Sequence, residues 1–283
     1  MNTIYHFSGA GNDFVVVDGR ESDVSEYRKV PCIQALCKEH KTDGLMILGQ
    51  EMPGQAGHDG DIVDFTMEFY NPDGSGGMMC GNGGRCIVAF ADYLGIRPGE
   101  RFLRPGGTRN DSEAKVYLFR APDGLHTGEI LARPEDGLWE VRIKMIDVQG
   151  ITPILGGWFL NTGTRHFVKF VDDVEQVDID TEGRALRWNE AFAPVGTNVN
   201  FVHVAPDGLH VRTFEKGVEG ETLACGTGLT ASAIAAYAAG VIPDADVRLR
   251  ARQDWLSVNF TPGADEKFTD VYLTGPARLV EIL

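Results

Sequence analysis

Short apolar stretches separated by polar turns recur along most of the chain. Such runs, rich in β-branched and aromatic residues, are typical of strands. The turn sequence Pro-Asp-Gly occurs at residues 72–74, 122–124 and 206–208 and suits tight connections between strands. The pattern therefore predicts a hairpin-rich, mostly antiparallel sheet. The predicted strands are Phe14–Val17, Leu45–Leu48, Val63–Phe69, Val116–Phe119, Glu140–Met145, Phe167–Val171, Val199–Val204, His210–Phe214 and Leu256–Phe260.

Two segments, Arg85–Leu94 and Thr230–Ala239, differ from all the others because they are apolar nearly all round. A helix of that kind must be surrounded by protein. Each segment is followed by a glycine suited to a left-handed cap, Gly95 or Gly240, and then by a proline three residues later. We therefore expect two buried helices, each enclosed by a sheet.

The sequence before each helix is a repeat centred on a cysteine. Cys80 and Cys225 lie 145 residues apart (225 − 80 = 145), and each begins a Cys-Gly-x-Gly turn. A phenylalanine precedes each cysteine by the same interval, at Phe69 and Phe214 (80 − 69 = 225 − 214 = 11). The repeat predicts two similar lobes facing each other across one site. We expect the boundary between the lobes near residue 148, with lobes at 1–148 and 149–271 and with the tail 272–283 returning to the first lobe.

Composition restricts the class of protein. The 283 residues are 43% hydrophobic and 24% charged, which is typical of globular proteins. The net charge of −15 argues against nucleic acid or an anionic membrane as a partner. No apolar run is long enough to span a bilayer, and the first residues lack the pattern of a secretory signal.

The cysteine pattern argues against a disulfide framework. The chain has five cysteines, an odd number, with no Cys-x-x-Cys pair and no histidine at zinc-ligand spacing. Free thiols in a reducing cytoplasm fit this count best. We expect Cys32, Cys37 and Cys86 to be small buried hydrophobic residues.

The position of Cys80 and Cys225 before helix N-termini has chemical consequences. The first amides of a helix have no internal partner, and partial positive charge there favours a thiolate over a thiol. The same amides can bind a carboxylate and the charge that develops when its α-carbon loses a proton. Two such termini would place one sulfur on each face of that carbon, with one acting as base and the other as acid. The alternative is that both turns only begin helices, without a catalytic role, and were inherited from one duplicated ancestor.

Competing motifs are weak. Gly9-Ala-Gly11-Asn-Asp-Phe14 begins like a dinucleotide-binding fingerprint, but Phe14 takes the place of the third glycine and a strand follows. A P-loop and a Gly-x-Ser-x-Gly elbow are absent from the sequence. The acidic run 171–175 is interpreted as a solvated face.

The motifs taken together resemble those of the diaminopimelate epimerase family, cofactor-independent epimerases of bacterial lysine and cell-wall synthesis. The resemblance extends over nearly the whole chain. It rests on Gly-Asn12-Asp-Phe, on Asn71-Pro-Asp-Gly-Ser followed by Met-Cys80-Gly-Asn-Gly-Gly-Arg-Cys, on Thr-Asn198-Val-Asn-Phe, and on Arg-Thr-Phe-Glu215-Lys-Gly followed by Ala-Cys225-Gly-Thr-Gly.

The resemblance implies an α+β fold with two pseudo-symmetric lobes, each a mostly antiparallel sheet or barrel wrapped around a central buried helix, and an active site in the cleft. It implies interconversion of LL- and meso-diaminopimelate through Cys80 and Cys225, without pyridoxal phosphate, metal or other cofactor. His166 and Glu215 would flank this catalytic pair. The implied substrate-binding residues are Asn12, Asn71, Gly81, Asn82, Thr164, Asn198, Glu215, Lys216, Gly226 and Thr227.

The chain departs from the family pattern at four places. Thr164-Arg165-His166 replaces the usual Asn-Pro-His or Ser-Pro-His, and Lys216 replaces an arginine that grips the distal carboxylate. The loop before Asp43 is shorter than in the family, and the stretch 102–133 is longer. The hypothesis is that Lys216, Thr164 and Arg165 still bind the distal group, with altered geometry.

Three functions remain open at the level of sequence. The first is diaminopimelate epimerase, the second is a two-thiol racemase for another amino acid such as histidine or proline, and the third is a non-catalytic or redox protein on the same scaffold. The expected partner is a small amino-acid substrate. The sequence does not fix the oligomeric state, and a homodimer is retained as an option.

Overall fold

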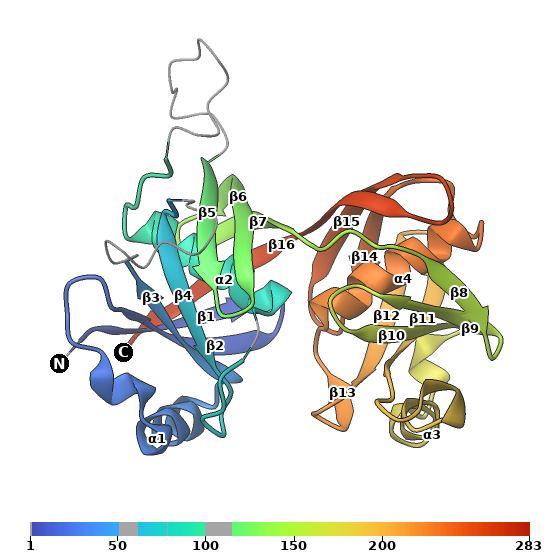
Figure 1. Ribbon diagram of the computed structural model, residues 1–283, viewed down its shortest axis with the longest axis horizontal. Coiled ribbons are helices and arrows are strands. Elements are labelled where there is room, and N and C mark those ends of the chain that lie inside the picture. The colour runs from blue at the N-terminus through green and yellow to red at the C-terminus, as the bar shows by residue number, and fades with distance from the viewer. Residues whose placement is uncertain (1, 51–61, 78, 100–114) are drawn as a thin grey trace, which may run out of the picture. The chain divides into compact units, whose positions relative to one another are not determined.

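The computed structural model describes residues 2–50, 62–77, 79–99 and 115–283. The chain divides into two compact units, which are drawn in Figure 1. Unit 1 comprises Met1–Ile143 and Pro276–Leu283, and unit 2 comprises Lys144–Gly275. The boundary between the units lies between residues 143 and 144, whereas the sequence predicted it near residue 148, and the C-terminal tail belongs to unit 1 from residue 276. Among the described residues, no helix is long and apolar enough to cross a membrane.

The strands of unit 1 form a closed barrel. Each strand from β1 to β7 pairs with the next, and β16 pairs with both β7 and β1. The pairs β2–β3 and β4–β5 are parallel because a connection containing a helix joins each pair. The strands are β1 (Ile4–Gly9), β2 (Asn12–Asp18), β3 (Gly44–Gly49), β4 (Phe65–Tyr70), β5 (Lys115–Ala121), β6 (Gly124–Glu135), β7 (Leu138–Lys144) and β16 (Phe268–Ile282).

Unit 1 contains two helices of different character. Helix α2 (Gly81–Tyr93) is buried along almost its whole length, from Gly81 to Asp92, because the barrel strands surround it. Helix α1 (Val30–His40) buries only Ile33 and Cys37 against the outside of the sheet. The fully buried α2 therefore forms the core of the unit, whereas α1 is an amphipathic cover.

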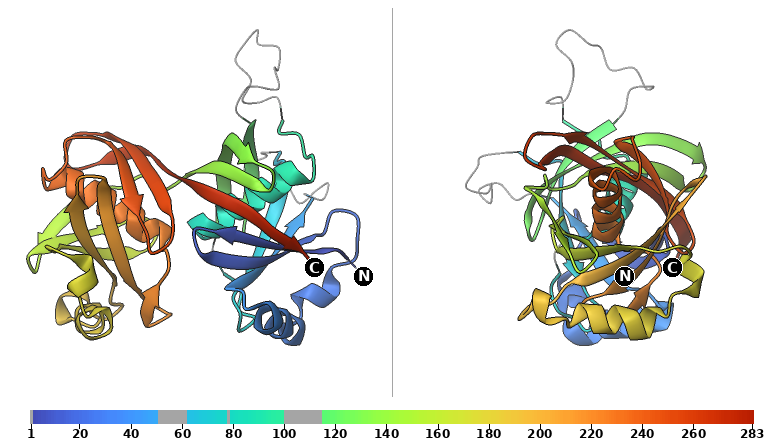
Figure 2. Two further views of the ribbon diagram at one scale, coloured as in Figure 1. Left: turned by 180° about the vertical axis from the view of Figure 1, so that it is seen from behind. Right: turned by 90° about the vertical axis from the view of Figure 1, so that its right-hand side faces the viewer.

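Unit 2 repeats this arrangement. Its strands follow the order β8-β9-β10-β11-β12-β14-β15-β16, with the short β13 paired to β12. The pairs β10–β11 and β12–β14 are parallel. Figure 2 shows the strands of this unit around its central helix. The strands are β8 (Ile151–Ile154), β9 (Gly157–Asn161), β10 (Arg165–Phe170), β11 (Asn198–Ala205), β12 (Gly208–Glu215), β13 (Gly220–Thr222), β14 (Asp246–Arg250) and β15 (Trp255–Pro262), and the helices are α3 (Arg184–Arg187) and α4 (Gly226–Ala238).

The internal repeat of the sequence is a repeat of structure. Helix α4 has the same length as α2, and both of its bounds lie 145 residues further along the chain (226 − 81 = 238 − 93 = 145). The two end in the same way, because Gly95 and Gly240 both have positive φ angles, 73° and 68°. The predicted α+β fold with two similar lobes, each built around a buried helix, is confirmed.

Most of the predicted elements are present, and the differences have local causes. The nine predicted strands fall within or overlap β2, β3, β4, β5, β7, β10, β11, β12 and β15. Both buried helices begin four residues earlier than the predicted segments, because the glycines of the Cys-Gly-x-Gly turns are already helical. Helix α1 was not predicted. Cys32 precedes Ile33 of the buried face of α1 and is itself only half-buried. The expectation of burial was therefore wrong for Cys32, whereas Cys37 and Cys86 are buried as expected.

Candidate active site

Cys80 is the N-terminal cap of helix α2. Its backbone is extended, with φ −100° and ψ 149°, and the helix begins at the next residue, Gly81. The Cys80 sulfur accepts a hydrogen bond from the backbone N–H of Gly83 at 3.2 Å. A sulfur in this position lies at the positive end of the helix dipole, which favours a thiolate.

The first turn of α2 is tied to the β1–β2 hairpin by a chain of side-chain hydrogen bonds. The buried amide of Asn82 donates to the side-chain carbonyl of Asn12. Asn12 in turn donates to Asp43 at 3.2 Å, and Asp43 also accepts the backbone N–H of Asp13 at 2.9 Å. At the other end, the fully buried Arg85 donates to the Asn82 oxygen at 2.9 Å. Asn12 and Asn82 are thereby brought together beside the helix that follows Cys80.

The β1–β2 hairpin that carries Asn12 is a tight turn. Ala10 and Gly11 both have positive φ angles, 58° and 88°. Gly9 permits close packing, because a Cβ atom there would lie 2.8 Å from the sulfur of Cys86. The glycine-rich N-terminal motif therefore serves a hairpin packed on α2, and no helix follows it as a dinucleotide site would require.

Asn71 lies in the turn after β4. Its side-chain amide donates to the hydroxyl of Ser75 at 3.0 Å, and its backbone N–H and carbonyl bond to Ser75 and Gly74. Asn71 therefore shapes the turn that precedes Cys80. Its role in substrate binding stays a prediction.

Cys225 caps helix α4 in the corresponding position of unit 2. The helix begins at Gly226, and the Cys225 side chain makes no capping hydrogen bond to its backbone. Instead the sulfur lies 3.5 Å from the hydroxyl of Thr227. The Thr227 oxygen lies 2.9 Å from Nε2 of His166, so the first turn of α4 is tied to strand β10.

His166 is fully buried in unit 2. Burial lowers the pKa of its imidazole from 6.5 to about 3, because the charged form is poorly solvated there. His166 is therefore a neutral imidazole at physiological pH. Its Nε2 lies 2.9 Å from Thr164 as well as Thr227, and its Nδ1 lies 3.1 Å from the side-chain nitrogen of Asn200.

Asn198 joins three segments of unit 2. Its side-chain nitrogen donates to the Thr164 hydroxyl at 3.1 Å and to the carbonyl of Arg165 at 2.9 Å, and its oxygen accepts the backbone N–H of Lys216 at 2.8 Å. Glu215, next to Lys216, accepts a hydrogen bond from Thr222 at 2.9 Å. Asn198 thus holds the start of the turn after β12 against β10.

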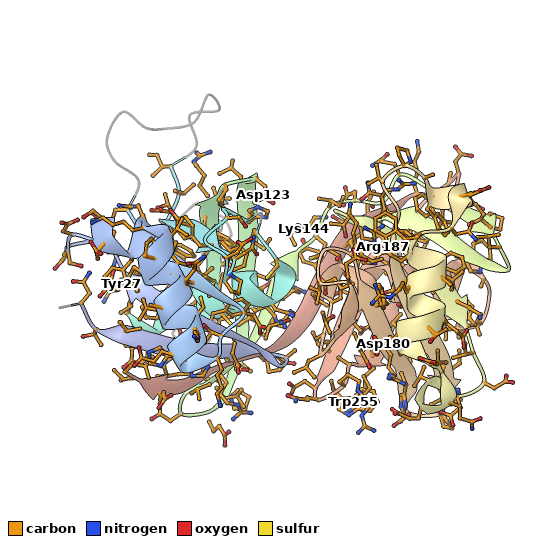
Figure 3. The ribbon with its side chains drawn as sticks, turned by 90° about the horizontal axis from the view of Figure 1, so that it is seen from below. Tyr27, Asp123, Lys144, Asp180, Arg187 and Trp255 are labelled. Atoms are coloured by element: carbon orange, nitrogen blue, oxygen red, sulfur yellow. The ribbon has the colours of Figure 1, made fainter. Side chains whose placement is uncertain are left out.

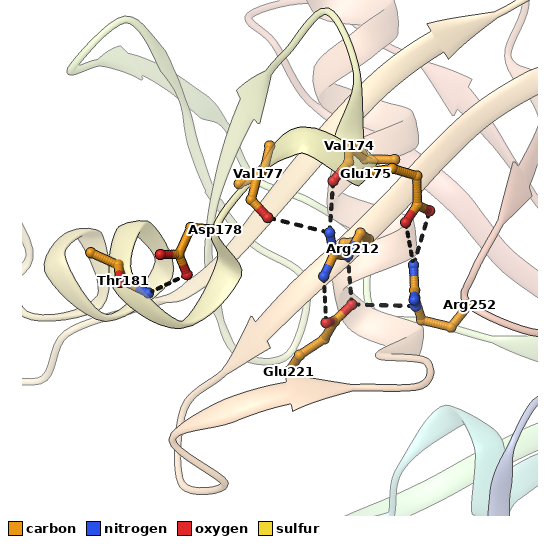
Figure 4. A network of polar contacts seen from close by, with 8 residues as sticks. All are labelled: Val174, Glu175, Val177, Asp178, Thr181, Arg212, Glu221 and Arg252. Atoms are coloured by element: carbon orange, nitrogen blue, oxygen red, sulfur yellow. Dashed lines mark hydrogen bonds and ion pairs between the residues drawn. The ribbon is translucent and has the colours of Figure 1, made fainter.

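Arg212 fixes the strand β12 that leads to this turn (Figure 4). Its guanidinium pairs bidentately with Glu221 of β13, at 2.7 Å for each contact, and donates to the carbonyl of Val174 at 2.8 Å. Arg252 joins the same network by pairing with Glu175 at 2.9 Å and approaching Glu221 at 3.5 Å. The hydrogen bond from Arg212 lowers the pKa of the Glu221 carboxyl and keeps it ionised.

Arg187, labelled in Figure 3, also supports this turn. This residue of α3 is buried and donates to Glu219 at 3.2 Å. Glu219 also accepts the backbone N–H of Gly217 at 3.2 Å. The turn that presents Glu215 and Lys216 is therefore held by two arginines, Arg187 and Arg212.

The second residue of each central helix ties the helix to a neighbouring strand, through an amide in α2 and through a hydroxyl in α4. Asn82 and Thr227 are equivalent in the repeat (227 − 82 = 145), and each connects its helix to a neighbouring strand. The surroundings differ: a Cβ on Gly83 would meet the sulfur of Met46 at 3.3 Å, whereas Gly228 packs against the polar side chain of Asn200. The helix after Cys80 thus rests partly on apolar groups, and the helix after Cys225 on a polar network.

Sequence reasoning did not single out Asn200, Thr213, Arg85 or Asp43. Asn200 was recognisable in principle, since it lies in the predicted strand Val199–Val204 two residues after Asn198, and extending that strand by one residue puts both side chains on the same face. A second polar residue on the buried face of an apolar strand indicates a built network. Among the described residues, no group of three or more His, Cys, Asp or Glu side chains is arranged to hold a metal ion.

Comparison with known proteins decides the family. The model of the diaminopimelate epimerase family matches residues 4–105 and 158–280. The chain belongs to the diaminopimelate epimerase family. The diaminopimelate epimerase of Chlorobaculum tepidum is 37% identical over 283 residues, covering 96% of this chain and 97% of that protein. The enzyme of Aquifex aeolicus is 38% identical over 289 residues, covering 96% and 93%.

Solved structures with little sequence similarity share the fold. The crystal structure of a Bacillus anthracis phenazine biosynthesis protein of the PhzF family superimposes with a TM-score of 0.72 at 12% identity. The match covers 100% of this chain and 98% of that one. At this identity the likeness concerns the fold alone.

The departure from the family pattern at Thr164 and Arg165 lies within unit 2. The hydroxyl oxygen of Thr164 lies 2.9 Å from Nε2 of His166. Arg165 donates to the carbonyl of Phe192 at 3.2 Å and lies over the ring of Phe159, so its guanidinium is engaged within the unit. Of the stretch 102–133, residues 102–114 lie outside the described residues.

Proposed function

We propose that this member of the family epimerises diaminopimelate, interconverting the LL and meso forms without a cofactor. The observation that carries the proposal is the placement of Cys80 and Cys225 as N-terminal caps of two equivalent buried helices. Relatives that share more than a third of their residues with this chain over almost its whole length bear the name diaminopimelate epimerase.

In the proposed mechanism one thiolate removes the α-proton and the other thiol returns a proton to the opposite face. The sulfur that gains a proton in one direction donates it in the reverse direction, so the proton balance closes without another group. The backbone amides at Gly81–Asn82 and Gly226–Thr227 bind the α-carboxylate and stabilise the enediolate-like charge. The mechanism requires both sulfurs to reach the same α-carbon.

The remaining predicted residues are assigned to substrate recognition. Asn12, Asn71, Thr164, Asn198 and Glu215 hold the substrate, while Lys216 binds the distal carboxylate as a point charge. His166 contributes as a neutral imidazole, in line with its burial. The cytoplasm as location and a homodimer as the assembly are parts of the same proposal.

The test is α-hydrogen exchange in deuterated water. The protein is incubated with LL-diaminopimelate, and the stereochemistry and deuterium content of the product are measured by chiral chromatography and mass spectrometry. We expect inversion with uptake of one solvent deuteron. Cys80→Ala and Cys225→Ala should each abolish net inversion, while Cys32→Ala, which removes a thiol from α1, should retain it. Undiminished inversion in either of the first two variants would exclude the two-thiol mechanism.

The second candidate function is racemisation of another amino acid. It is supported by Lys216, which stands where the family usually has an arginine. An ammonium lacks the bidentate grip of a guanidinium on a carboxylate. The same assay with ornithine, lysine, histidine and proline separates the two functions. If an amino acid without a second carboxylate is turned over faster than diaminopimelate, that amino acid is the substrate and diaminopimelate is not. A redox function instead predicts a reversible Cys80–Cys225 disulfide that changes activity towards a partner.

A further inference from the structure

The hydrogen bonds of Asn200 determine which nitrogen of His166 carries the proton. The side-chain nitrogen of Asn200 lies 3.1 Å from the carbonyl oxygen of Phe167, and its side-chain oxygen accepts the hydroxyl of Thr213 at 2.9 Å. Turning the amide over would place two oxygens against each other at Phe167. The nitrogen must therefore face His166 and donate to its Nδ1, which lies 3.1 Å away.

This contact fixes the tautomer of His166. A neutral imidazole has one proton, and Nδ1 uses its lone pair to accept from Asn200. The proton accordingly lies on Nε2. It points to the hydroxyl oxygens of Thr164 and Thr227, each 2.9 Å from Nε2.

The tautomer then determines the direction of the Thr227 hydroxyl. Thr227 accepts from Nε2–H, so its own proton must be donated to another acceptor. The Thr164 oxygen lies 3.5 Å away and already accepts from Asn198 as well as facing Nε2–H. The sulfur of Cys225 also lies 3.5 Å from the Thr227 oxygen, a normal distance for a hydrogen bond to sulfur.

We propose that Asn200 is a positioning residue that holds His166 as its Nε2–H tautomer and thereby directs the Thr227 hydroxyl proton to the sulfur of Cys225, where it stabilises the thiolate. The ordered series runs from Thr213 through Asn200, His166 and Thr227 to Cys225. Its catalytic meaning rests on the proposed function, whereas the tautomer and the thiolate can be measured without any turnover.

Cys80 provides a control within the same molecule. Its sulfur accepts a backbone N–H, from Gly83, and a backbone donor cannot rotate away as a hydroxyl can. The two thiols should therefore respond differently to changes at Asn200 or Thr227. A shift confined to Cys225 is the signature of the network, because general loosening of the protein would affect both cysteines.

The first measurement needs no substitution. In protein labelled with ¹⁵N-histidine, the His166 resonances, assigned by their loss in His166→Gln, should show a protonated Nε2 and an unprotonated Nδ1 between about pH 5 and pH 8. A protonated Nδ1 in the unsubstituted protein would overturn the proposal outright.

The second measurement follows alkylation of each cysteine by iodoacetamide as a function of pH, with peptide mass spectrometry as the readout. Thr227→Val should raise the pKa of the Cys225 thiol and slow its alkylation near pH 7 by roughly tenfold, corresponding to about one pKa unit. Thr227→Ser should restore the rate. Asn200→Leu should produce a mixture of His166 tautomers and a smaller shift of the same sign.

The controls separate this role from a structural one. Ser232→Ala removes another buried hydroxyl from α4, one that bonds to the Gly228 carbonyl at 2.7 Å, and should leave the Cys225 profile unchanged. An unchanged Cys225 profile in Thr227→Val, or equal shifts at Cys80 and Cys225, would contradict the proposal. Absence of diaminopimelate turnover with the expected alkylation profiles would refute the proposed function and leave this inference standing.

Discussion

Gly228 lies so close to Asn200 that a Cβ atom at position 228 would collide with the side-chain oxygen of Asn200. The second glycine of the Cys-Gly-Thr-Gly turn is therefore required by a side chain from strand β11. The same Cβ would also lie 3.3 Å from the sulfur of Cys225. Gly228 therefore lies where the start of helix α4, the buried polar network and the Cys225 thiol meet.

Gly228→Ala should therefore displace Asn200 from His166. We expect a loss of about 1 to 3 kcal/mol in the free energy of unfolding, which is usual for an overpacked site, together with a large fall in kcat. Urea denaturation and steady-state kinetics measure the two effects. Gly220→Ala is the matched control, because no atom lies within 4 Å of its Cβ and its φ is compatible with alanine. Equal effects of the two substitutions would contradict the steric explanation.

The buried carboxylate of Asp92 should anchor the C-terminal end of helix α2. It accepts from Lys115 at 2.6 Å and from Trp139 at 2.9 Å and pairs with Arg133 at 2.6 Å. Burial alone would raise the pKa of Asp92, but these donors outweigh it and hold the pKa below its ordinary value. Asp92→Asn leaves two cations facing a neutral group and should cost about 2 to 4 kcal/mol of stability.

The sign of the pH dependence for Asp92 follows from its lowered pKa. The stabilisation is complete above the carboxyl pKa of the unfolded chain and is lost as the pH falls towards the lower folded value. Unfolding by urea should therefore show a smaller difference between Asp92→Asn and the unsubstituted protein in acid than at neutral pH. Asp147→Asn, which breaks the exposed pair with Lys144, should leave stability unchanged within error.

His166 should make the protein less stable in mild acid. Its folded pKa of about 3 lies below the ordinary 6.5, so the unfolded chain binds this proton more readily. Stability is lost as the pH falls from about 6.5 towards 3, by about 2 to 3 kcal/mol at pH 4.5. His166→Gln should flatten this part of the curve measured by urea denaturation. An equally steep decline in the variant would show that other groups cause it.

The Arg212–Glu221 pair should control the turn that carries Glu215 and Lys216. Arg212→Met removes two contacts to the carboxylate and hydrogen bonds to the carbonyls of Val174 and Val177, and should cost about 1.5 to 3 kcal/mol of stability. Activity should fall further than stability alone explains, at temperatures where the variant is folded. Arg278→Met, which breaks a single exposed contact to Glu135 at 3.3 Å, is the control. Full activity in folded Arg212→Met would show that the Arg212–Glu221 pair has no effect on catalysis.

Lys216 should act on substrate binding and not on the chemical step. Lys216→Met should raise KM for diaminopimelate by roughly ten- to a hundredfold with little change in kcat, as expected when uniform binding energy is lost. Lys216→Arg should lower KM, because the guanidinium can bind the distal carboxylate bidentately. Kinetics with both enantiomeric forms of lysine, which lacks that carboxylate, should be insensitive to either change. A fall in kcat with constant KM would contradict this role.

By itself the sequence determined the repeat, the two buried helices and the position of Cys80 and Cys225 at their start. These features follow from local signals: apolar periodicity, glycine and proline at the helix ends, and a motif recurring after 145 residues. The amphipathic α1 was missed because its buried face consists of only Ile33 and Cys37.

Only the tertiary structure decided what the side chains do. His166 and Thr227 are 61 residues apart, and Asn12 and Asn82 are 70 apart, so their meeting depends on strand register and on barrel closure. The parallel pairing of β10 with β11 places Asn198 opposite His166, and Asn200 two residues further on. No periodicity encodes such contacts, because hydrogen-bond partners are chosen by geometry after the chain has folded. The two cysteines at the helix starts could therefore be found from the sequence, whereas the hydrogen-bond network beside Cys225 could not.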